Sequence, residues 1–420
     1  MSYSQRLRER ERDLGRPLRV GLVGAGQMGR GMAAQLTRIP GMTLGAVFDV
    51  DVERAQQAAA SSGATMVETN PERAADALNA GIPVALADAA AAADLDLDAV
   101  VDATGVPEVG AQIAHRCLLA GRDFVTLNVE TDVTVGLYLG ALSDASGAVY
   151  SVADGDEPVS AKELFDFAED LGFEVVTAGK GKNNPFDPTA TPDSAAESAE
   201  RRRMNPKMLA SFLDGSKTMI EMAALANATG FVPDKVGMHG PKAQVDELPG
   251  VLVPTEDGGI LSGRGRVDYA FGPAPGVFVI VTAEDPIVSE QMAYLSMGDG
   301  PYWVFYRPYH LASLEAARSV ARAVLDRRSS LRPMTWSAEV VAVAKRDLVP
   351  GDTIDGIGGH AVRGVTYPAA EADGLLPLGL AQGGTVQKAV ALGEPVPSAA
   401  IDLPDSTIGM LRRFQDQMFT

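Results

Sequence analysis

The sequence predicts an α/β fold with a doubly wound parallel sheet, followed by an α+β region and a small all-β module. Residues 17–155 alternate apolar strands with helical patterns, and a glycine-rich turn at 24–29 follows the first strand. Residues 335–405 contain short apolar runs separated by Gly and Pro turns. Strands and helices that alternate at this spacing are typical of parallel sheets with right-handed crossovers.

The first predicted region, residues 1–155, begins with a short charged helix over 5–13. Strands are expected at 18–23, 42–48, 99–102, 124–127 and 148–152, and the second helix at 29–38. An amphipathic helix over 311–325, within segment 308–330, is expected to pack back on this region. A chain of 420 residues exceeds one ordinary domain, so we expect two or three.

The α+β region is predicted over residues 156–330 and the all-β module over 335–405, with a helix in 406–420. We expect a helix over 158–171, a strand over 174–178 and a polar loop over 179–185. A single helix is expected over 206–228, and strands over 277–282 and 338–344.

Charge and cysteine content exclude several classes of function. The net charge is −19, from 36 basic and 55 acidic residues, which argues against nucleic acid or an anionic membrane as partner. A small anionic substrate is possible if its pocket gathers positive charge. The single Cys117 excludes an internal disulfide and a Cys-based zinc site, and we expect it to be buried and inert. There is no apolar run long enough for a membrane span and no secretory signal, so we expect a cytoplasmic location.

The glycine-rich turn predicts a dinucleotide site of the Rossmann type. Gly24 would make the tight turn, Gly26 would admit a pyrophosphate and Gly29 would allow close packing of helix on strand. The helix N-terminus supplies free N–H groups to phosphates, and Asp49 at the tip of the second strand suits a ribose. The other candidate cofactor residues follow this turn or later strands of the sheet: Gln27, Met28, Thr104, Gly105, Asn128 and Glu130.

Segment 180–184 is the sharpest chemical feature outside the glycine turn. Lys180, Lys182, Asn183 and Asn184 place several donors on a short stretch, and flanking glycines would let its backbone approach a ligand. Such a segment suits a phosphate or carboxylate, and a buried lysine in it could exchange a proton with a carbonyl or alcohol. The alternative is a solvated turn.

Three further groups have both a structural and a chemical interpretation. Asp156 and Glu157 precede a predicted helix; capping is favoured over a Mg²⁺ or Mn²⁺ site. Asp214, Lys217 and Glu221 would share one face of the 206–228 helix, either as a charged surface stripe or as an acid–base face. Arg307 and His310 flank Pro308 and Tyr309 and are candidates to close a pocket, whereas His239 between glycines is interpreted as structural.

Several blocks together resemble the homoserine-dehydrogenase-like oxidoreductases that carry a C-terminal SAF-type β domain, and are similar to the 1-deoxy-D-xylulose 5-phosphate reductoisomerase-like (type II) enzymes. The matching blocks are Asp102–Gly105, Asn128–Glu130, Gly155–Pro158, Ala178–Pro185, Asp214–Met219, Ala226–Gly230, Met238–Pro241 and Arg307–His310. The resemblance implies hydride transfer between a nicotinamide and a small anionic carbonyl or polyol compound. It also implies a SAF-like (β-clip) domain and a homo-oligomer, a dimer or tetramer. For the reductoisomerase it further implies a divalent metal.

The stretch after the second strand departs from that pattern. Enzymes of the reductoisomerase-like type would be expected to carry basic residues there for the 2′-phosphate of NADPH. This chain has acids, including Asp49 and Asp51, with only Arg54 to offset them. Because carboxylates repel a 2′-phosphate, we expect NAD(H) to be preferred over NADP(H).

The resulting expectation is an NAD(P)-dependent oxidoreductase for a small anionic oxo or hydroxy compound. Segment 180–184 would hold the anionic group and the carbonyl of this substrate. Lys182 or Lys217 would be the proton donor, and Arg307 and His310 would close the pocket. Two alternatives remain open: a metal-dependent reductoisomerase-like enzyme, and a non-catalytic NAD(H)-binding sensor.

Overall fold

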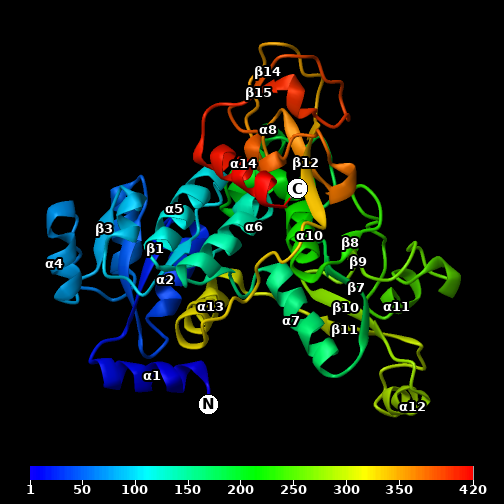
Figure 1. Cartoon of the computed structure of the whole chain (residues 1–420), viewed down its shortest axis with the longest axis horizontal. Coiled ribbons are helices and arrows are strands. Elements are labelled where there is room, and N and C mark those ends of the chain that lie inside the picture. The colour runs from blue at the N-terminus through cyan, green and yellow to red at the C-terminus, as the bar shows by residue number, and fades with distance from the viewer. Residues whose placement is uncertain (420) are drawn as a thin grey trace. The chain divides into compact units, whose positions relative to one another are not determined.

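The computed structural model describes residues 1–419, which form two compact units. Unit 1 comprises Met1–Asp156, Leu311–Arg332 and the C-terminal segment from Ser406; unit 2 comprises Glu157–His310 and Pro333–Asp405. Figure 1 shows unit 1 mainly in blue and cyan, with yellow and red segments that return to it from later in the chain.

Unit 1 is built on a six-stranded parallel sheet with helices between its strands. The sheet has the strand order β3-β2-β1-β4-β5-β6, which is the order of doubly wound dinucleotide-binding sheets. Its strands are β1 (Leu18–Val23), β2 (Met42–Phe48), β3 (Val84–Leu86), β4 (Ala99–Asp102), β5 (Asp123–Thr126) and β6 (Tyr150–Val152). Its helices are α1 (Tyr3–Leu14), α2 (Gln27–Leu36), α3 (Val52–Ala60), α4 (Ala74–Asn79), α5 (Pro107–Leu119), α6 (Val129–Ser146), α13 (Ala312–Asp326) and α14 (Thr407–Phe419).

The register of this sheet aligns the carboxyl ends of its central strands. Val23 pairs with Phe48 on one side and with Asp102 on the other, and Asp102 pairs with Thr126. The loops that leave these strands therefore share one edge, where ligands bind in open α/β sheets. Helix α13 belongs to unit 1 and packs on α2, and its buried Val320 joins the core that contains Leu22 and Val101. The predicted α/β fold class is confirmed.

Unit 2 is built on a five-stranded mixed sheet with the order β11-β10-β7-β9-β8. β7 (Glu174–Gly181) is central; it runs parallel to β9 and antiparallel to β10. The remaining strands are β8 (Val232–Pro233), β9 (Arg266–Ala270), β10 (Val277–Thr282), β11 (Tyr302–Arg307), β12 (Ala338–Ala344), β13 (Val362–Pro368), β14 (Thr385–Val386) and β15 (Ile401–Asp402). The helices are α7 (Glu157–Asp170), α8 (Pro192–Arg202), α9 (Pro206–Leu213), α10 (Ser216–Thr229), α11 (Leu248–Val251) and α12 (Pro286–Tyr294).

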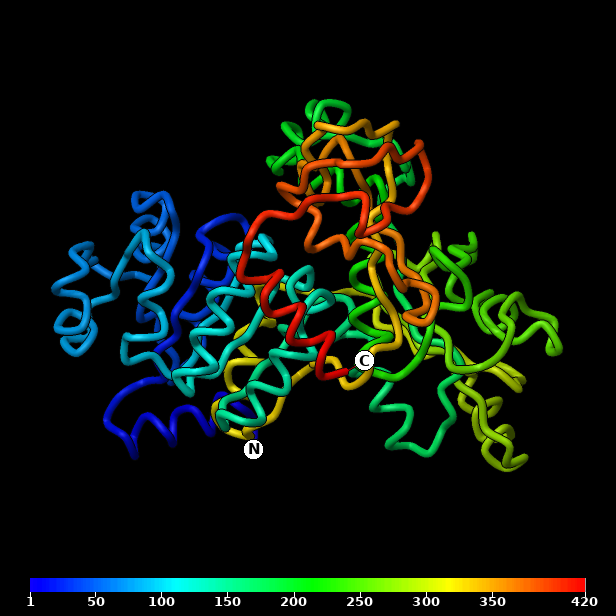
Figure 2. Tube along the Cα trace, turned by 45° about the horizontal axis from the view of Figure 1, so that its top comes forward, coloured from blue at the N-terminus to red at the C-terminus, as the bar shows by residue number. Residues whose placement is uncertain are grey.

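Residues 335–405 form the expected β-rich segment, but they are part of unit 2 rather than a unit of their own. The β12–β13 hairpin packs on α10, where Thr366 Oγ1 donates to the carbonyl of Met219 and Asn227 Oδ1 accepts from two backbone N–H groups, those of Ser337 and Ala338. Figure 2 shows the orange and red trace of this segment gathered beside green trace from earlier in unit 2. These hydrogen bonds join residues far apart in sequence, so composition alone did not show that this segment belongs to unit 2.

Two elements of unit 2 differ from the sequence-based expectation. Strand β7 continues to Gly181, so Lys180 lies in the sheet rather than in a loop, because its neighbours pair with both β9 and β10. The helix expected over 206–228 is two helices, α9 and α10, separated at Asp214 and Gly215. Gly215 has a φ of 88°, which interrupts right-handed helix and which glycine adopts without a side-chain clash.

The structure also bears on membrane-spanning helices and on the reactivity of Cys117. Among residues 1–419, no helix combines the length and apolar character that crossing a bilayer requires. Cys117 is buried in α5, and burial raises the pKa of its thiol to about 12. A thiol at that pKa stays protonated and unreactive at neutral pH.

Candidate functional site

The glycine turn of unit 1 has a geometry suited to a dinucleotide. Gly24 has a φ of 93°, and a Cβ there would lie 2.9 Å from the carbonyl oxygen of Ala103. A Cβ on Gly29 would lie 1.9 Å from the carbonyl oxygen of Gly24. The folded chain itself therefore requires glycine at both positions.

Gly26 differs from the other two glycines. A Cβ there would meet no atom within 4 Å, and its φ of −70° is open to any residue. Nothing in the protein explains this glycine, whereas a pyrophosphate that approaches the backbone at the start of α2 would. The turn thus fits the diphosphate of a dinucleotide. Gln27 and Met28, also predicted to contact the cofactor, are exposed in the first turn of α2.

Asp49 lies at the tip of β2 beside this turn. Its Oδ2 accepts from the backbone N–H of Ala25 at 2.8 Å, and its Oδ1 accepts from the N–H of Asp51 at 3.0 Å. These bonds hold the carboxylate at the edge of the glycine turn. Arg54, which was expected to offset the acids here, pairs with Asp51 at 3.7 Å.

The other predicted cofactor residues are organised by an acid that the sequence analysis did not single out. Asp102, fully buried at the end of β4, accepts from the backbone N–H of Thr104 at 2.9 Å and from Thr104 Oγ1 at 2.7 Å. It also accepts from Asn128 Nδ2 at 3.1 Å. Burial raises the pKa of Asp102. An acid that ends an apolar strand at the ligand edge was the sequence signal for this role.

Asn128 and Glu130 are therefore placed inside the protein. Asn128 is completely buried; its Nδ2 also donates to the carbonyl of Val106, and its Oδ1 caps α6 by accepting from the N–H of Thr131. Glu130 is buried in the first turn of α6. Gly105, with a φ of 64°, makes the turn after Thr104. Asn128 thus shapes the loop of Thr104 and Gly105 through internal bonds.

In unit 2, Lys180 is the centre of a buried charge cluster. Its Nζ lies 2.7 Å from Glu157 Oε1 and makes a short ion pair with Glu221. Lys217 lies 3.9 Å from Glu221, one helical turn along α10, and His310 Nε2 lies 3.3 Å from Glu157. Strand β7 and helices α7 and α10 thus bring together residues from three separately predicted groups: Lys180, Glu157, and Lys217 with Glu221.

The two glutamates of this cluster have pKa values that are shifted in opposite directions. Burial raises the pKa of Glu221, and the nearby Glu157 raises it further. Burial also opposes ionisation of Glu157, but Lys180 and His310 outweigh it and hold its pKa well below the usual range. Burial would lower the pKa of Lys180, yet the two glutamates raise it, so Lys180 stays protonated. Lys180 is thus a fixed positive charge.

The pKa of Lys182, two residues after Lys180, is shifted in the opposite direction. Lys182 is 6% exposed, and its Nζ donates to the carbonyl of Phe212 at 2.7 Å. Burial first, and then the charge of Lys180, lower its pKa to about 8. A lysine with this pKa can give or take a proton near neutral pH.

The rest of segment 179–184 does not form the donor-rich loop expected from sequence. A Cβ on Gly179 would lie 2.0 Å from the carbonyl oxygen of Asp268, and one on Gly181 2.3 Å from the backbone nitrogen of Ala274. These glycines serve packing within the sheet rather than approach of a ligand. Asn184 Oδ1 accepts from Arg202 at 2.9 Å, while Asn183 is exposed.

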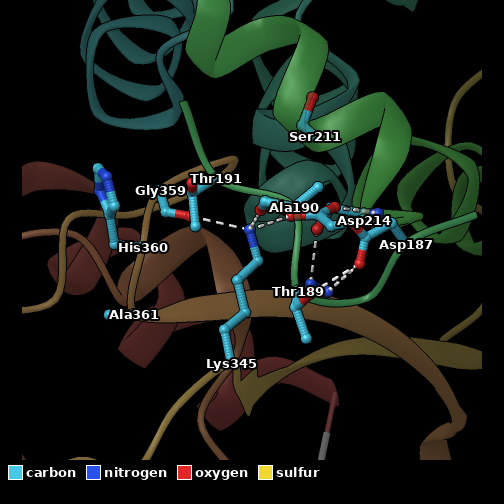
Figure 3. Close-up of polar contacts among 12 residues, drawn as sticks. Asp187, Thr189, Ala190, Thr191, Ser211, Asp214, Lys345, Gly359, His360 and Ala361 are labelled. Carbon is cyan, nitrogen blue, oxygen red and sulfur yellow. Dashed lines mark hydrogen bonds and ion pairs between the residues drawn. The ribbon is translucent and has the colours of Figure 1, made fainter. Parts of the chain in front are cut away.

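Arg307 and Asp214 each pair with a residue that was not predicted to contact them. Arg307 Nη1 lies 3.1 Å from Glu163, and its guanidinium lies 4.7 Å from the ring centroid of Tyr309. Asp214 caps the end of α9 and pairs with Lys345 at 2.5 Å, both being buried, so it does not share a helical face with Lys217. Figure 3 shows Lys345 pointing at Asp214 and at the carbonyls of Ala190 and Gly359.

Glu157, the carboxylate predicted to bind a metal in unit 2, already pairs with a cation of the protein. Glu157 accepts from Lys180, which neutralises it, and His310 is its second neighbour. Asp156 ends the first segment of unit 1, and its N–H donates to the carbonyl of Ala153. We therefore derive no chemical step through a metal ion.

Comparison with known proteins gives one family match. Residues 155–316 match the family model described as "Oxidoreductase DRL, catalytic domain". This range contains Lys180, Lys182, Lys217 and Glu221. Most of the matched range lies in unit 2, and the match supports an enzyme of the NAD(P)-dependent oxidoreductase class.

A curated relative and several solved structures are also similar. The relative is Inositol 2-dehydrogenase 4 of Saccharopolyspora erythraea, 54% identical over 57 residues, which are 13% of this chain and 17% of the relative. The structures include a myo-inositol dehydrogenase from Corynebacterium glutamicum (TM-score 0.42, 13% identity, 74% of this chain and 89% of that one). Another is a scyllo-inositol dehydrogenase from Lactobacillus casei (TM-score 0.41, 13% identity, 76% and 92%). At these values the structural likenesses carry no functional information.

Proposed function

We propose that this chain is an NAD(P)-dependent oxidoreductase that transfers hydride between a nicotinamide and a small anionic oxo or hydroxy compound. One observation carries the proposal. Inside the region that matches an oxidoreductase catalytic domain, Lys182 is buried with a pKa of about 8, next to Lys180, whose charge is fixed by two glutamates. This pairing provides a proton donor and a permanent cation in the same place.

The dinucleotide is assigned to unit 1. Gly24, Gly26 and Gly29 would admit its diphosphate, and Asp49 would accept hydrogen bonds from its ribose. When bound, the nicotinamide supplies or accepts the hydride. The carboxylate of Asp49 disfavours a 2′-phosphate, which supports NAD(H) as the preferred form.

The acid–base chemistry is assigned to Lys182. In the reducing direction its ammonium would give a proton to the carbonyl oxygen; in the oxidising direction its neutral amine would take the hydroxyl proton. Lys180 would stabilise the developing alkoxide, because its charge is already oriented and needs no rearrangement. Lys180 also lowers the pKa of Lys182 into the working range, after burial.

The finer assignment, a 1-deoxy-D-xylulose 5-phosphate reductoisomerase-like enzyme, rests on the resemblance of the sequence blocks. It would add a divalent metal and a rearrangement of the carbon skeleton before reduction. The short match to an inositol 2-dehydrogenase supports a second candidate substrate class, a polyol. Both candidates use the same proton-transfer residue and differ in substrate and in metal dependence.

The deciding experiment is an initial-rate assay of the purified protein. NADH and NADPH oxidation would be followed with 1-deoxy-D-xylulose 5-phosphate, with Mn²⁺ and with a chelator, and NAD⁺ reduction would be followed with myo-inositol. Turnover faster with NADH supports the proposal, and Mn²⁺ dependence assigns the reductoisomerase. If NADH binds but no oxo or hydroxy compound in a wider screen turns over, the chain is a sensor and the proposal is wrong.

A further inference from the structure

Arg363 carries a positive charge that no ion pair neutralises within residues 1–419. It lies half-buried on β13, opposite Val343, and burial lowers the pKa of its guanidinium. Among residues 1–419 no hydrogen bond and no ion pair holds this guanidinium; its close neighbour is the ring of Phe186, with a centroid 5.9 Å away. Because the side chain is only half-buried, this guanidinium remains open to an anion that approaches from solvent.

Contacts from three segments bring Arg363 to the turn between α9 and α10. The N–H of Gly364, its neighbour, donates to Ser216 Oγ at 2.7 Å. The ring of Phe186 lies against Gly215, where a Cβ would be 2.8 Å from it. Phe186 is 43% exposed, so Arg363 lies over an aromatic ring that remains open to solvent.

The same turn gathers the two lysines predicted to donate a proton. Lys182 Nζ donates to the carbonyl of Phe212, at the end of α9. Lys217 lies in the first turn of α10. The N-cap, Gly215, has no side-chain acceptor, and Asp214 Oδ1 accepts from the N–H of Ser216, the first residue of the helix. Residues 212–217 thus lie near three cationic side chains: Lys182, which follows β7, Lys217 of α10 and Arg363 of β13.

The charges around this turn do not balance. Lys345 neutralises Asp214, and Lys180 with Lys217 neutralises Glu157 with Glu221. In the part of the chain that the structure describes, Arg363 and protonated Lys182 form no ion pair with a carboxylate. Their combined charge matches a phosphate dianion better than a single carboxylate. The positive charge that the acidic chain would need for an anionic substrate is therefore concentrated at this turn.

We propose that Arg363 and the start of α10, beside the proton donor Lys182, form the binding site for the phosphate group of the substrate, so that the C-terminal β-rich segment supplies a specificity residue to the catalytic domain. This inference rests on the proposed function, because it names the anion of the same substrate. An arginine fork offers paired N–H donors to phosphate oxygens, which an ammonium does not. Phe186 would hold the guanidinium plane in place through its ring face.

Calorimetric titration with inorganic phosphate tests the site in the full chain. Arg363→Gln should weaken binding about 10- to 100-fold, the loss expected for hydrogen bonds to a charged group. Arg363→Lys should recover only part of the affinity, because it keeps charge but not the fork. The matched control is Arg346→Gln, which removes an arginine of the same segment that already pairs with Asp352. The control should bind phosphate like the parent protein.

Two outcomes would overturn the inference. Phosphate affinity of Arg363→Gln within about twofold of the parent would remove Arg363 from the site. Acetate or malonate that bound as tightly as phosphate, with the same dependence on Arg363, would assign a carboxylate instead. Folding is checked by thermal unfolding, and Arg363→Gln should not lower Tm without phosphate, because it removes an unpaired charge. NADH binding and turnover, measured separately, report on the proposed function, so either proposal can fail alone.

Discussion

The glycine turn at 24–29 and the lysine segment at 180–184 are both short and motif-like. They differ in how far the local sequence predicts their structure. The turn has the structure that its residue spacing predicts: strand, turn, helix and an acid at the next strand tip. The lysine segment lies partly in a sheet, and its residues take separate roles set by groups far away in sequence.

The difference shows where chemical function is encoded. Gly24 and Gly29 respond to steric limits within a few residues or one neighbouring strand, so local pattern suffices to assign them. Lys180 and Lys182 are two residues apart and equally buried, but one stays protonated and the other has a pKa of about 8. Their divergence depends on which of them faces Glu157 and Glu221.

The largest expected effect is that of Lys182→Met. The variant keeps most of the side-chain volume and removes the ionisable amine, so turnover should fall by about 10²- to 10⁴-fold, the range for loss of a general acid or base. NADH affinity, measured by fluorescence titration, should not change. Lys388→Met is the control, because Lys388 is exposed in the same unit. Normal turnover of Lys182→Met would show that the low pKa is incidental.

The pH profile separates the two lysines of the segment. If protonated Lys182 is the acid for reduction, the rate should be constant below about pH 8 and fall about tenfold per unit above it. In the oxidising direction the neutral amine is needed, so the rate should rise toward pH 8 and then level off. Initial rates measured in both reaction directions from about pH 6 to about pH 10 test these two profiles. A reduction rate that stays constant through this range would assign the proton to another group.

Two glycine variants test the glycine turn, whose structure the local sequence predicts. Gly29→Ala places a Cβ 1.9 Å from the carbonyl oxygen of Gly24, so it should lower the free energy of unfolding by about 1–3 kcal/mol or more. Gly26→Ala meets no protein atom and should leave stability unchanged, while weakening NADH binding by about tenfold through contact with the diphosphate. Urea unfolding and NADH titration of both variants provide the measurement. Unchanged NADH affinity in Gly26→Ala would argue against a dinucleotide at this turn.

The smallest effect is expected at the ribose position. Asp49→Asn removes the charge that repels a 2′-phosphate but keeps an amide oxygen that can accept from the backbone. The ratio of kcat/KM for NADH to that for NADPH should fall by about tenfold, a change of about 1.4 kcal/mol. Glu53→Gln, at an exposed position in the first turn of α3, is the charge-matched control. An equal fall in that control would attribute the preference to general charge rather than to Asp49.

The sequence by itself determined the architecture of unit 1 and the location of its ligand edge. Strands at 18–23, 42–48 and 99–102 were predicted with the bounds that the structure has, because apolar runs bounded by glycine and charged residues are local signals. Short β3 was missed, since three apolar residues are too few to show a period. Asp102 was named in a matching block but assigned no role in the site, because its role depends on the bonds that it accepts from Thr104 and Asn128.

Tertiary structure decided the chemistry of unit 2. The break at Gly215 separates Asp214 from Lys217, and only the fold reveals that Lys345, more than a hundred residues later, neutralises Asp214. The same contacts between β13 and α10 place Arg363 beside the 212–217 turn. Charge, burial and pKa are properties of groups brought together in space, and no periodicity in a single sequence records which groups will meet.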